Sequence, residues 1–396
     1  MFNISNSSYL PMNPVGGTLI YFVQIFIFGL IVIINIDIGS LSRFHIQRYN
    51  FFLWIVFLIA FLFLISVYVN FNSNVDAKSF TKLISYPILF FLFFFIFPKA
   101  LFNKDALFEK FLNFWIIFSL FASVIGFLFY FLDIHFNPNF NDNNAMIAFF
   151  IHPNTFSFVF TFAVPMVIYK FFTKQISMGL FVVLIIILLL CLLFTFSRAG
   201  YMGTFASILI LTYKRSKYFF ITALIILTIL GATLFLSFAT GKTDSSISRL
   251  QVMYIGYDMI VNNGLGKFLW GYGVTNHAVV FKNNLAVFGN RDELDPHNLL
   301  LLLGIQYGVL FTSAFIFGII FLLVKSFLLK SKKMSFEFNQ KIGLAIAIVV
   351  GILVQDILED IIAYPEFFEM PMFLIFLGYL YYSIYQNKNK LLKSDA

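Results

Sequence analysis

Runs of about twenty apolar residues recur from one end of the 396-residue chain to the other. A run of this length, wound as an α-helix, crosses the roughly 30 Å hydrocarbon layer of a bilayer. Only 11% of the residues are charged, against about a quarter in soluble domains, and the mean hydropathy is +0.92. The sequence therefore predicts an all-α integral membrane protein and excludes a soluble domain with a single anchor.

The apolar runs predict about eleven membrane spans, or about twelve if one span is atypical, within a single polytopic domain over residues 1–396. The expected spans cover 18–38, 51–70, 81–97, 111–132, 147–170, 178–197, 199–213, 218–239, 298–325, 341–363 and 367–386. The polar segment 240–297 separates the eighth span from the ninth. We expect it to be one large loop outside the membrane.

Basic residues gather in every second connection between these spans. The basic connections fall at 43–48, 99–110, 170–174, 214–217, 325–341 and 388–393. The other short connections hold only Lys78, Lys82 and Arg198. Because Lys and Arg accumulate on the cytoplasmic side, we expect the N-terminus and the loop 240–297 outside, and the C-terminus in the cytoplasm.

Several classes of function do not fit this composition. The net charge is +8, but the basic residues are spread between apolar runs, which is typical of topology signals and not of a nucleic-acid site. The single cysteine, Cys191, excludes an internal disulfide and a cysteine metal cluster. No phosphate-binding Walker motif is present, so the sequence does not indicate an ATP-driven pump subunit.

Arg198 interrupts the apolar sequence CLLFTFSRAGYMGTFASILIL at the expected outer turn between two spans. One interpretation is an interfacial arginine that reaches the lipid headgroups. The other is an anion clamp, because guanidinium is always charged and its planar fork matches phosphate oxygens. Gly200, Gly203 and Ser207 follow at helical spacing and would let a neighbouring helix or a lipid chain come close.

Arg249 belongs to the segment 247–263, ISRLQVMYIGYDMIVNN, whose apolar residues have helical spacing. We expect a helix along the membrane surface, capped by Asp244 or Ser245, with Arg249 in its first turn. The helix dipole favours anions at that end. A cationic arginine in the first turn is therefore unfavourable unless an anion binds beside it. A solvated loop arginine is the alternative.

His297 belongs to the sequence DPHNLLLLLGIQYG. Asp295 suits the N-cap and Pro296 the first helical position, which would place His297 in the first turn of the ninth span. Helical geometry then puts Gly304 and Gly308 on the same face as His297. An imidazole at a helix N-terminus is expected to be neutral and able to accept a proton. A capping or interfacial histidine is the alternative.

Acidic residues near the outer end of the tenth span form one helix face, namely Asp356, Glu359 and Asp360. Intramembrane acids are costly and therefore indicate function. Two roles are open for Asp356 and Glu359: an ion pair with Arg198 or Arg249, or proton transfer.

Two further patterns leave alternatives open. Asp292, Glu293, Asp295 and His297 are a possible hard-metal site, although carboxylates before a histidine are common in loops. The sequence His152-Pro153-Asn154 is expected to break the fifth span near its outer end, as a re-entrant or kinked start would.

The order of four motifs resembles the O-antigen polymerase and O-antigen ligase superfamily of bacterial inner-membrane proteins. The motifs are HPNTFSFVFTFAVP, FTFSRAGYMG, GLGKFLWGYGVTNH in the loop, and HNLLLLLGIQYGVLF. The resemblance covers about residues 145–325. The spacing from His297 to Gly308 matches the family, whereas Ser-Arg-Ala-Gly departs from the family's usual Ser-Arg-Gly.

The resemblance implies a glycosyltransferase that uses a glycan on undecaprenyl pyrophosphate, with no nucleotide sugar, metal or other cofactor. Arg198 and Arg249 match family residues that hold the pyrophosphate. His297 matches an essential outer-loop histidine, which we interpret as the base for the attacking sugar hydroxyl, with contact to the pyrophosphate as the alternative. Further candidates for substrate contact are Arg291, Asn298 and Asn154.

Within this superfamily, the sequence favours a polymerase of O-antigen or capsule over a ligase that transfers glycan to lipid A core. The expected partners are a lipid-linked oligosaccharide, membrane lipids and a chain-length regulator protein. A transporter or flippase of lipid-linked glycan is the alternative from another class. It would place polar residues along a path through the membrane centre, whereas the charged candidates here gather at one expected face.

The expected topology is testable by cysteine labelling. In protein whose Cys191 has been replaced, a single cysteine near Asn276 should react with a membrane-impermeant thiol reagent in intact spheroplasts. A single cysteine near Ser331 should react only after lysis. The reverse pattern would invert the orientation and put His297 in the cytoplasm.

Overall fold

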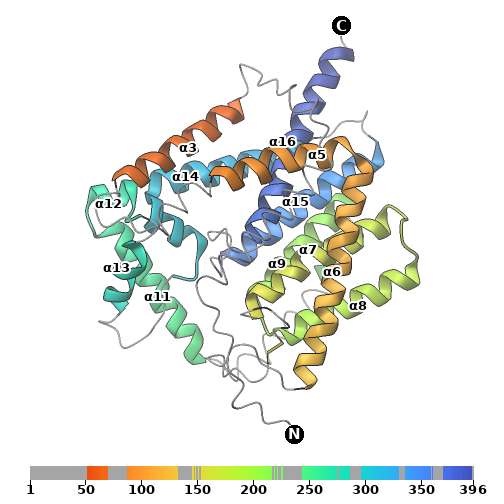
Figure 1. The fold of residues 1–396 in the computed structure, drawn as a ribbon, viewed down its shortest axis with the longest axis horizontal. Helices are drawn as coiled ribbons and strands as arrows, with labels where there is room; N and C mark the ends of the chain where they lie inside the picture. Colours follow the sequence, from red (N-terminus) through yellow and green to blue (C-terminus); the bar gives the residue numbers. More distant parts are fainter. Residues whose placement is uncertain are drawn as a thin grey trace.

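The computed structural model describes residues 51–69, 87–132, 145–146, 153–215, 243–273, 276–285, 296–329, 335–357 and 369–394, and isolated positions at 148, 150, 218, 221, 224, 225 and 359. Throughout this part of the chain every secondary-structure element is a helix, as the all-α prediction requires (Figure 1). The elements are α3 (Phe51–Val69), the π-helix η1 (Phe91–Ile96), α5 (Phe97–Asn103), α6 (Asp105–Phe131), α7 (Pro153–Phe172), α8 (Met178–Phe194), α9 (Arg198–Arg215), α11 (Thr243–Val261), α12 (Leu265–Trp270), α13 (Asn276–Leu285), α14 (Leu299–Leu328), α15 (Phe336–Asp356) and α16 (Glu369–Ser394).

Four of the described helices, α6, α7, α14 and α15, are long and apolar enough to cross a membrane. Shorter apolar stretches lie in α3, α8, α16 and the run through η1 and α5, where further spans are expected. The protein is thus a multi-pass helical membrane protein. The expected span 18–38 and most of 218–239 lie outside the described residues, so the count of eleven stays a prediction.

Several expected spans have different ends in the structure, among them the two that border the site. The span expected at 147–170 begins as a helix only at Pro153, since proline lacks an N–H and suits a first helical turn. The span expected at 341–363 begins earlier, where the Ser335 hydroxyl accepts a hydrogen bond from the Phe338 N–H at 3.2 Å. Its helix ends at Asp356.

Helix α7 is the centre of the bundle. All of its side chains except Phe171 are buried, and α6, α8, α9 and α15 pack against it. Its buried residues include polar ones near the N-terminal end, among them Asn154, Ser157 and Thr161. Their hydrogen bonds must be satisfied within the protein, because neither the core nor the lipid supplies water.

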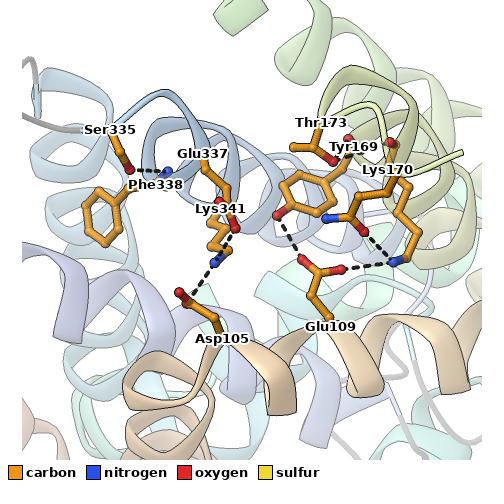
Figure 2. A network of polar contacts seen from close by, with 10 residues as sticks. Asp105, Glu109, Tyr169, Lys170, Thr173, Ser335, Glu337, Phe338 and Lys341 are labelled. Carbon is orange, nitrogen blue, oxygen red and sulfur yellow. Dashed lines mark hydrogen bonds and ion pairs between the residues drawn. The ribbon is translucent and has the colours of Figure 1, made fainter.

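A network of ion pairs joins one end of the bundle (Figure 2). Lys170 near the end of α7 pairs with Glu109 of α6 at 2.9 Å. Lys341 of α15 pairs with Asp105 of α6 at 2.8 Å and with Glu337 at 2.9 Å. Both lysines are buried, whereas Asp105 and Glu337 are largely exposed, so water screens the two pairs of Lys341 more than the pair of Lys170. The network joins α6, α7 and α15.

The ion pairs of Lys170 and Lys341, here called the ion-pair lock, and the polar N-terminal part of α7 lie at opposite ends of that helix. Lys170 and Asn154 are separated by about 24 Å, at 1.5 Å per residue. The lock contains the start of α6, the end of α7 and the start of α15, which the alternation of basic connections assigns to one side of the membrane.

Small residues bring α9 and α15 into close contact. A Cβ added to Gly203 would lie 2.7 Å from the Gly351 carbonyl oxygen and 2.8 Å from Gln355 Cβ. Ser207 donates a hydrogen bond across the interface to the Ala347 carbonyl at 3.0 Å. The glycines after Arg198 thus serve helix packing, one of the two roles expected for them.

The expected outer loop contains α11, α12 and α13, here called the outer helical group, over residues 243–285. Figure 1 shows this group gathered beside α14, on the opposite side of the view from α6 and α8. It packs on α14 through a separate apolar cluster of Val252, Ile255, Met259, Ile260, Tyr272, Phe281 and Ile305. The segment is therefore a folded layer over the start of α14.

Candidate functional site

Arg198 is the first residue of α9, and its side chain is exposed. Helix α8 ends at Phe194, so the expected turn lies between two helices, and their assignment as membrane spans stays a prediction. Ser197 caps the new helix, because its hydroxyl accepts the Gly200 N–H at 3.1 Å. A guanidinium at a helix start, where the helix dipole favours negative charge, forms an environment that attracts anions.

Behind Arg198, a buried hydrogen-bond network connects α7, α9 and α15. The Gln355 side-chain nitrogen donates to the Ser157 hydroxyl at 2.7 Å, and the Thr161 hydroxyl donates to the Gln355 side-chain oxygen at 2.6 Å. Ser157 in turn hydrogen-bonds to the Ser197 hydroxyl at 3.0 Å. Every member of this network is buried, and sequence reasoning did not single out Gln355 or Ser157.

Two of the expected acids are buried at this end of α15. Asp356 is the last residue of the helix and has no exposed surface. Glu359 is 5% exposed and accepts a hydrogen bond from the Asn154 side-chain nitrogen. Glu359 is thus bound to an amide of α7, while its expected pairing with Arg198 stays a prediction. Asp360 lies outside the described residues.

His297 precedes α14 and is partly exposed. Its φ of 49° lies in the left-handed region, which residues other than glycine rarely adopt. The next residue, Asn298, is the actual N-cap, because its side-chain oxygen accepts the Leu301 N–H at 3.0 Å. The Asn298 side-chain nitrogen donates to the Ile357 carbonyl at 2.7 Å. One asparagine therefore ties the start of α14 to the end of α15.

The expected helix start at His297 is wrong. Pro296 and His297 lie before the helix, and Asp295 is outside the described residues. The expected shared face of His297 with Gly304 and Gly308 is also wrong, because Gly308 is not helical. The position of His297 is therefore set by the bend that precedes α14 and not by the helix.

Helix α14 is broken at Gly308, whose φ and ψ are 79° and 170°. The break lets a loop of the outer helical group reach the carbonyls of the preceding turn. The Tyr272 N–H donates to the Ile305 carbonyl at 2.7 Å, and the Gly273 N–H donates to the Gln306 carbonyl at 2.9 Å. The motif GLGKFLWGYG is thus anchored on the kink.

Close backbone contact makes glycine necessary on both sides of this junction. A Cβ added to Gly271 would lie 2.6 Å from the Gly308 nitrogen, and one added to Gly308 would lie 2.5 Å from the Trp270 nitrogen. The Ser66 hydroxyl of α3 donates to the Trp270 carbonyl at 2.7 Å. The junction thereby joins α3, α12 and α14.

Tyr272 fastens the same loop to α11. Its hydroxyl donates to the Met259 carbonyl at 3.3 Å. Burial, together with the negative charge of Asp258, raises the pKa of Tyr272, which keeps the hydroxyl protonated as a donor. The Lys267 ammonium lies 5.1 Å from the centroid of the Tyr272 ring, a cation–π distance.

Arg249 lies in the second turn of α11, because that helix begins at Thr243. The expected start of the helix is therefore wrong, and the argument from the helix dipole no longer applies to Arg249. Asp244 and Ser245 lie within the helix, where neither is its N-cap. The Arg249 side chain and the whole of Arg291 lie outside the described part of the chain.

The structure brings His297 and Arg198 to the same end of the bundle. Asn298, next to His297, contacts the end of α15, whose Gln355 reaches the start of α9 through Ser157. This end is opposite the ion-pair lock of α6, α7 and α15. Within the described residues, no group of three or more His, Cys, Asp or Glu side chains is placed to hold a metal ion.

Residues 182–316 match the O-antigen ligase family. The resemblance to the O-antigen polymerase and ligase superfamily is thereby confirmed. The match covers about a third of the chain, from α8 to the middle of α14, and includes Arg198, Arg249 and His297. A search of curated proteins found no match to the chain.

The matched segment does not contain the whole candidate site. Asn154, Ser157 and Thr161 come from α7, and Gln355 and Glu359 come from α15 or just after it. The signal that would have found Gln355 was available, because a polar side chain in an apolar span indicates function as an acid does. Ser157 carries no such signal, since serine is common in membrane helices.

We predict that Gly308→Ala loosens the anchored loop. Alanine would be strained at this φ and would also contact the Trp270 backbone, at a cost of about 1–3 kcal/mol. Amide hydrogen exchange of peptides from 264–273, measured in detergent, should become faster.

Gly304→Ala is the matched control in the same helix. Its added Cβ would meet only the end of the Ile260 side chain, at 2.8 Å from Cδ1, and its backbone is helical. Exchange in 264–273 should stay unchanged there. Unchanged exchange in Gly308→Ala as well would contradict the role given to the kink.

Proposed function

We propose that the protein is a polymerase of a bacterial surface polysaccharide, O-antigen or capsule. It would transfer a glycan from undecaprenyl pyrophosphate to a sugar hydroxyl of another lipid-linked repeat unit, at the outer face of the inner membrane. The observation that carries this proposal is the family match over Arg198, Arg249 and His297. The placement of Arg198 and His297 at one end of the bundle supports it.

Arg198 is proposed to bind the pyrophosphate of the donor. Guanidinium binds phosphate oxygens through two parallel hydrogen bonds and stabilises the charge that develops as the pyrophosphate leaves. Its position at the end of two apolar helices suits a ligand with a lipid tail and a charged headgroup. Arg249 is proposed to contact the same headgroup from α11.

His297 is proposed as the general base. The acceptor hydroxyl oxygen forms a bond to the anomeric carbon while the bond from that carbon to the pyrophosphate oxygen breaks. The hydroxyl proton moves to the imidazole, and undecaprenyl pyrophosphate leaves with the bonding electrons. Asp356 and Glu359 are the next candidates for the proton.

A polymerase is favoured over a ligase because it must hold two lipid-linked substrates. The chain offers cationic groups for more than one headgroup: Arg198, Arg249, Lys242, Lys267, Lys282 and Arg291. A flippase is disfavoured, because the buried network near the start of α7 is made of internally paired groups, whereas a transport path would expose polar groups across the membrane.

A deletion strain separates these functions by its surface glycans on a gel. Loss of a polymerase should leave lipid that carries a single repeat unit, without the ladder of long chains. Loss of a ligase would instead leave core without repeat units, while long polymer accumulates on undecaprenyl pyrophosphate. An unchanged ladder would rule out both enzymes.

The role of His297 is testable in the same strain. His297→Ala and His297→Asn should both fail to restore the ladder, because neither side chain can take a proton; loss of a general base typically lowers the rate by about 10²–10⁴-fold. Immunoblots of membranes should show normal protein levels. Full restoration by His297→Asn would mean that the residue only donates or accepts a hydrogen bond.

A further inference from the structure

Gln355 occupies the point at which α7, α9 and α15 meet. It has no exposed surface, and both polar atoms of its side-chain amide hydrogen-bond to protein groups. The oxygen accepts from Thr161 at 2.6 Å, and the nitrogen donates to the Ser157 hydroxyl at 2.7 Å and to the Asn154 carbonyl at 3.4 Å. All three partners belong to α7, so Gln355 connects the end of α15 to the start of α7.

The same serine supports the first turn of α9. Ser157 hydrogen-bonds to Ser197, the residue that caps α9 and directly precedes Arg198. Gly200, one turn on, packs so closely on Ser157 that an added Cβ would overlap both its Cβ and its hydroxyl. Ser157 therefore contacts both the cap and the first turn of α9.

We propose that Gln355 is a positioning residue, which holds Arg198 in its working place through Ser157 and Ser197. The inference rests on the proposed function and adds a residue of α15, outside the matched segment, to the donor site. Gln355 touches no substrate in this role. Its contribution comes from fixing the helix start from which the exposed arginine extends.

The chemistry of the amide explains why glutamine suits this position. The Ser157 and Thr161 hydroxyls also have partners other than Gln355, because Ser157 hydrogen-bonds to the Asn154 carbonyl at 2.6 Å and Thr161 lies 3.2 Å from the Thr204 hydroxyl. One amide serves both, since it donates with its nitrogen and accepts with its oxygen. An apolar residue of similar length would fill the space but remove the hydrogen bonds that hold the end of α15 to both hydroxyls.

The test measures how the effect of Gln355 depends on Arg198. In purified protein with a lipid-linked repeat unit as substrate, Gln355→Met should lower kcat/KM for the donor by about 10–100-fold, as small misplacements of a binding group do. In Arg198→Ala protein, the same change should lower the remaining activity less than about two-fold, because residues that act as one unit are not additive.

Two further variants separate positioning from general stability. Ser157→Ala breaks the other link of the same path and should reproduce the loss, which keeps the test open if Gln355→Met does not fold. Ser207→Ala removes an α9–α15 hydrogen bond away from the path and should leave activity unchanged.

The inference would be overturned by equal losses from Gln355→Met with and without Arg198, or by an equal loss from Ser207→Ala. Wild-type protein that makes no polymer from the lipid-linked substrate would instead overturn the proposed function itself.

Discussion

The close contact of α9 with α15 is the interaction on which the rest of the site depends. Glycines at 203 and 351 let the two backbones approach until the Gly351 carbonyl leaves no room for a side chain on α9. At that distance, short polar side chains can pair directly across the interface. Since neither lipid nor core supplies water to these groups, the polar side chains buried beside this contact, such as Gln355, hydrogen-bond within the protein.

The two ends of the bundle use different polar chemistry. One end is closed by buried lysines paired with carboxylates, which hold α6, α7 and α15 together. The other end uses mainly amides and hydroxyls around Gln355, with a buried carboxylate at Glu359. This arrangement leaves the Arg198 guanidinium exposed at its edge. A ligand with a lipid tail and an anionic headgroup requires this combination of apolar helices and an exposed cation.

The second half of the proposed site depends on the outer helical group. The break at Gly308 admits a loop from that group, and the start of α14 then lies under its apolar cluster. His297 directly precedes the N-cap of α14. The hydrogen bond from Asn298 to the Ile357 carbonyl holds this start of the helix against the end of α15. The histidine and the arginine therefore reach the same end of the bundle through different contacts, which meet only at α15.

The sequence by itself determined the helical membrane class, the expected alternation of the connections, the turn at Arg198 and the resemblance to the superfamily, because apolar length, charge and short motifs are local properties. The tertiary structure decided the rest. The segment from Asp295 to Asn298 offers two capping residues, and local pattern favoured the wrong one, since Asn298 is selected partly by its bond to α15. Helix α14 is broken at Gly308, where it meets a loop about forty residues earlier in the chain. Gln355 hydrogen-bonds to Ser157, which lies 198 positions away in the sequence. These contacts depend on which helices pack against one another, and the local sequence pattern does not predict that packing.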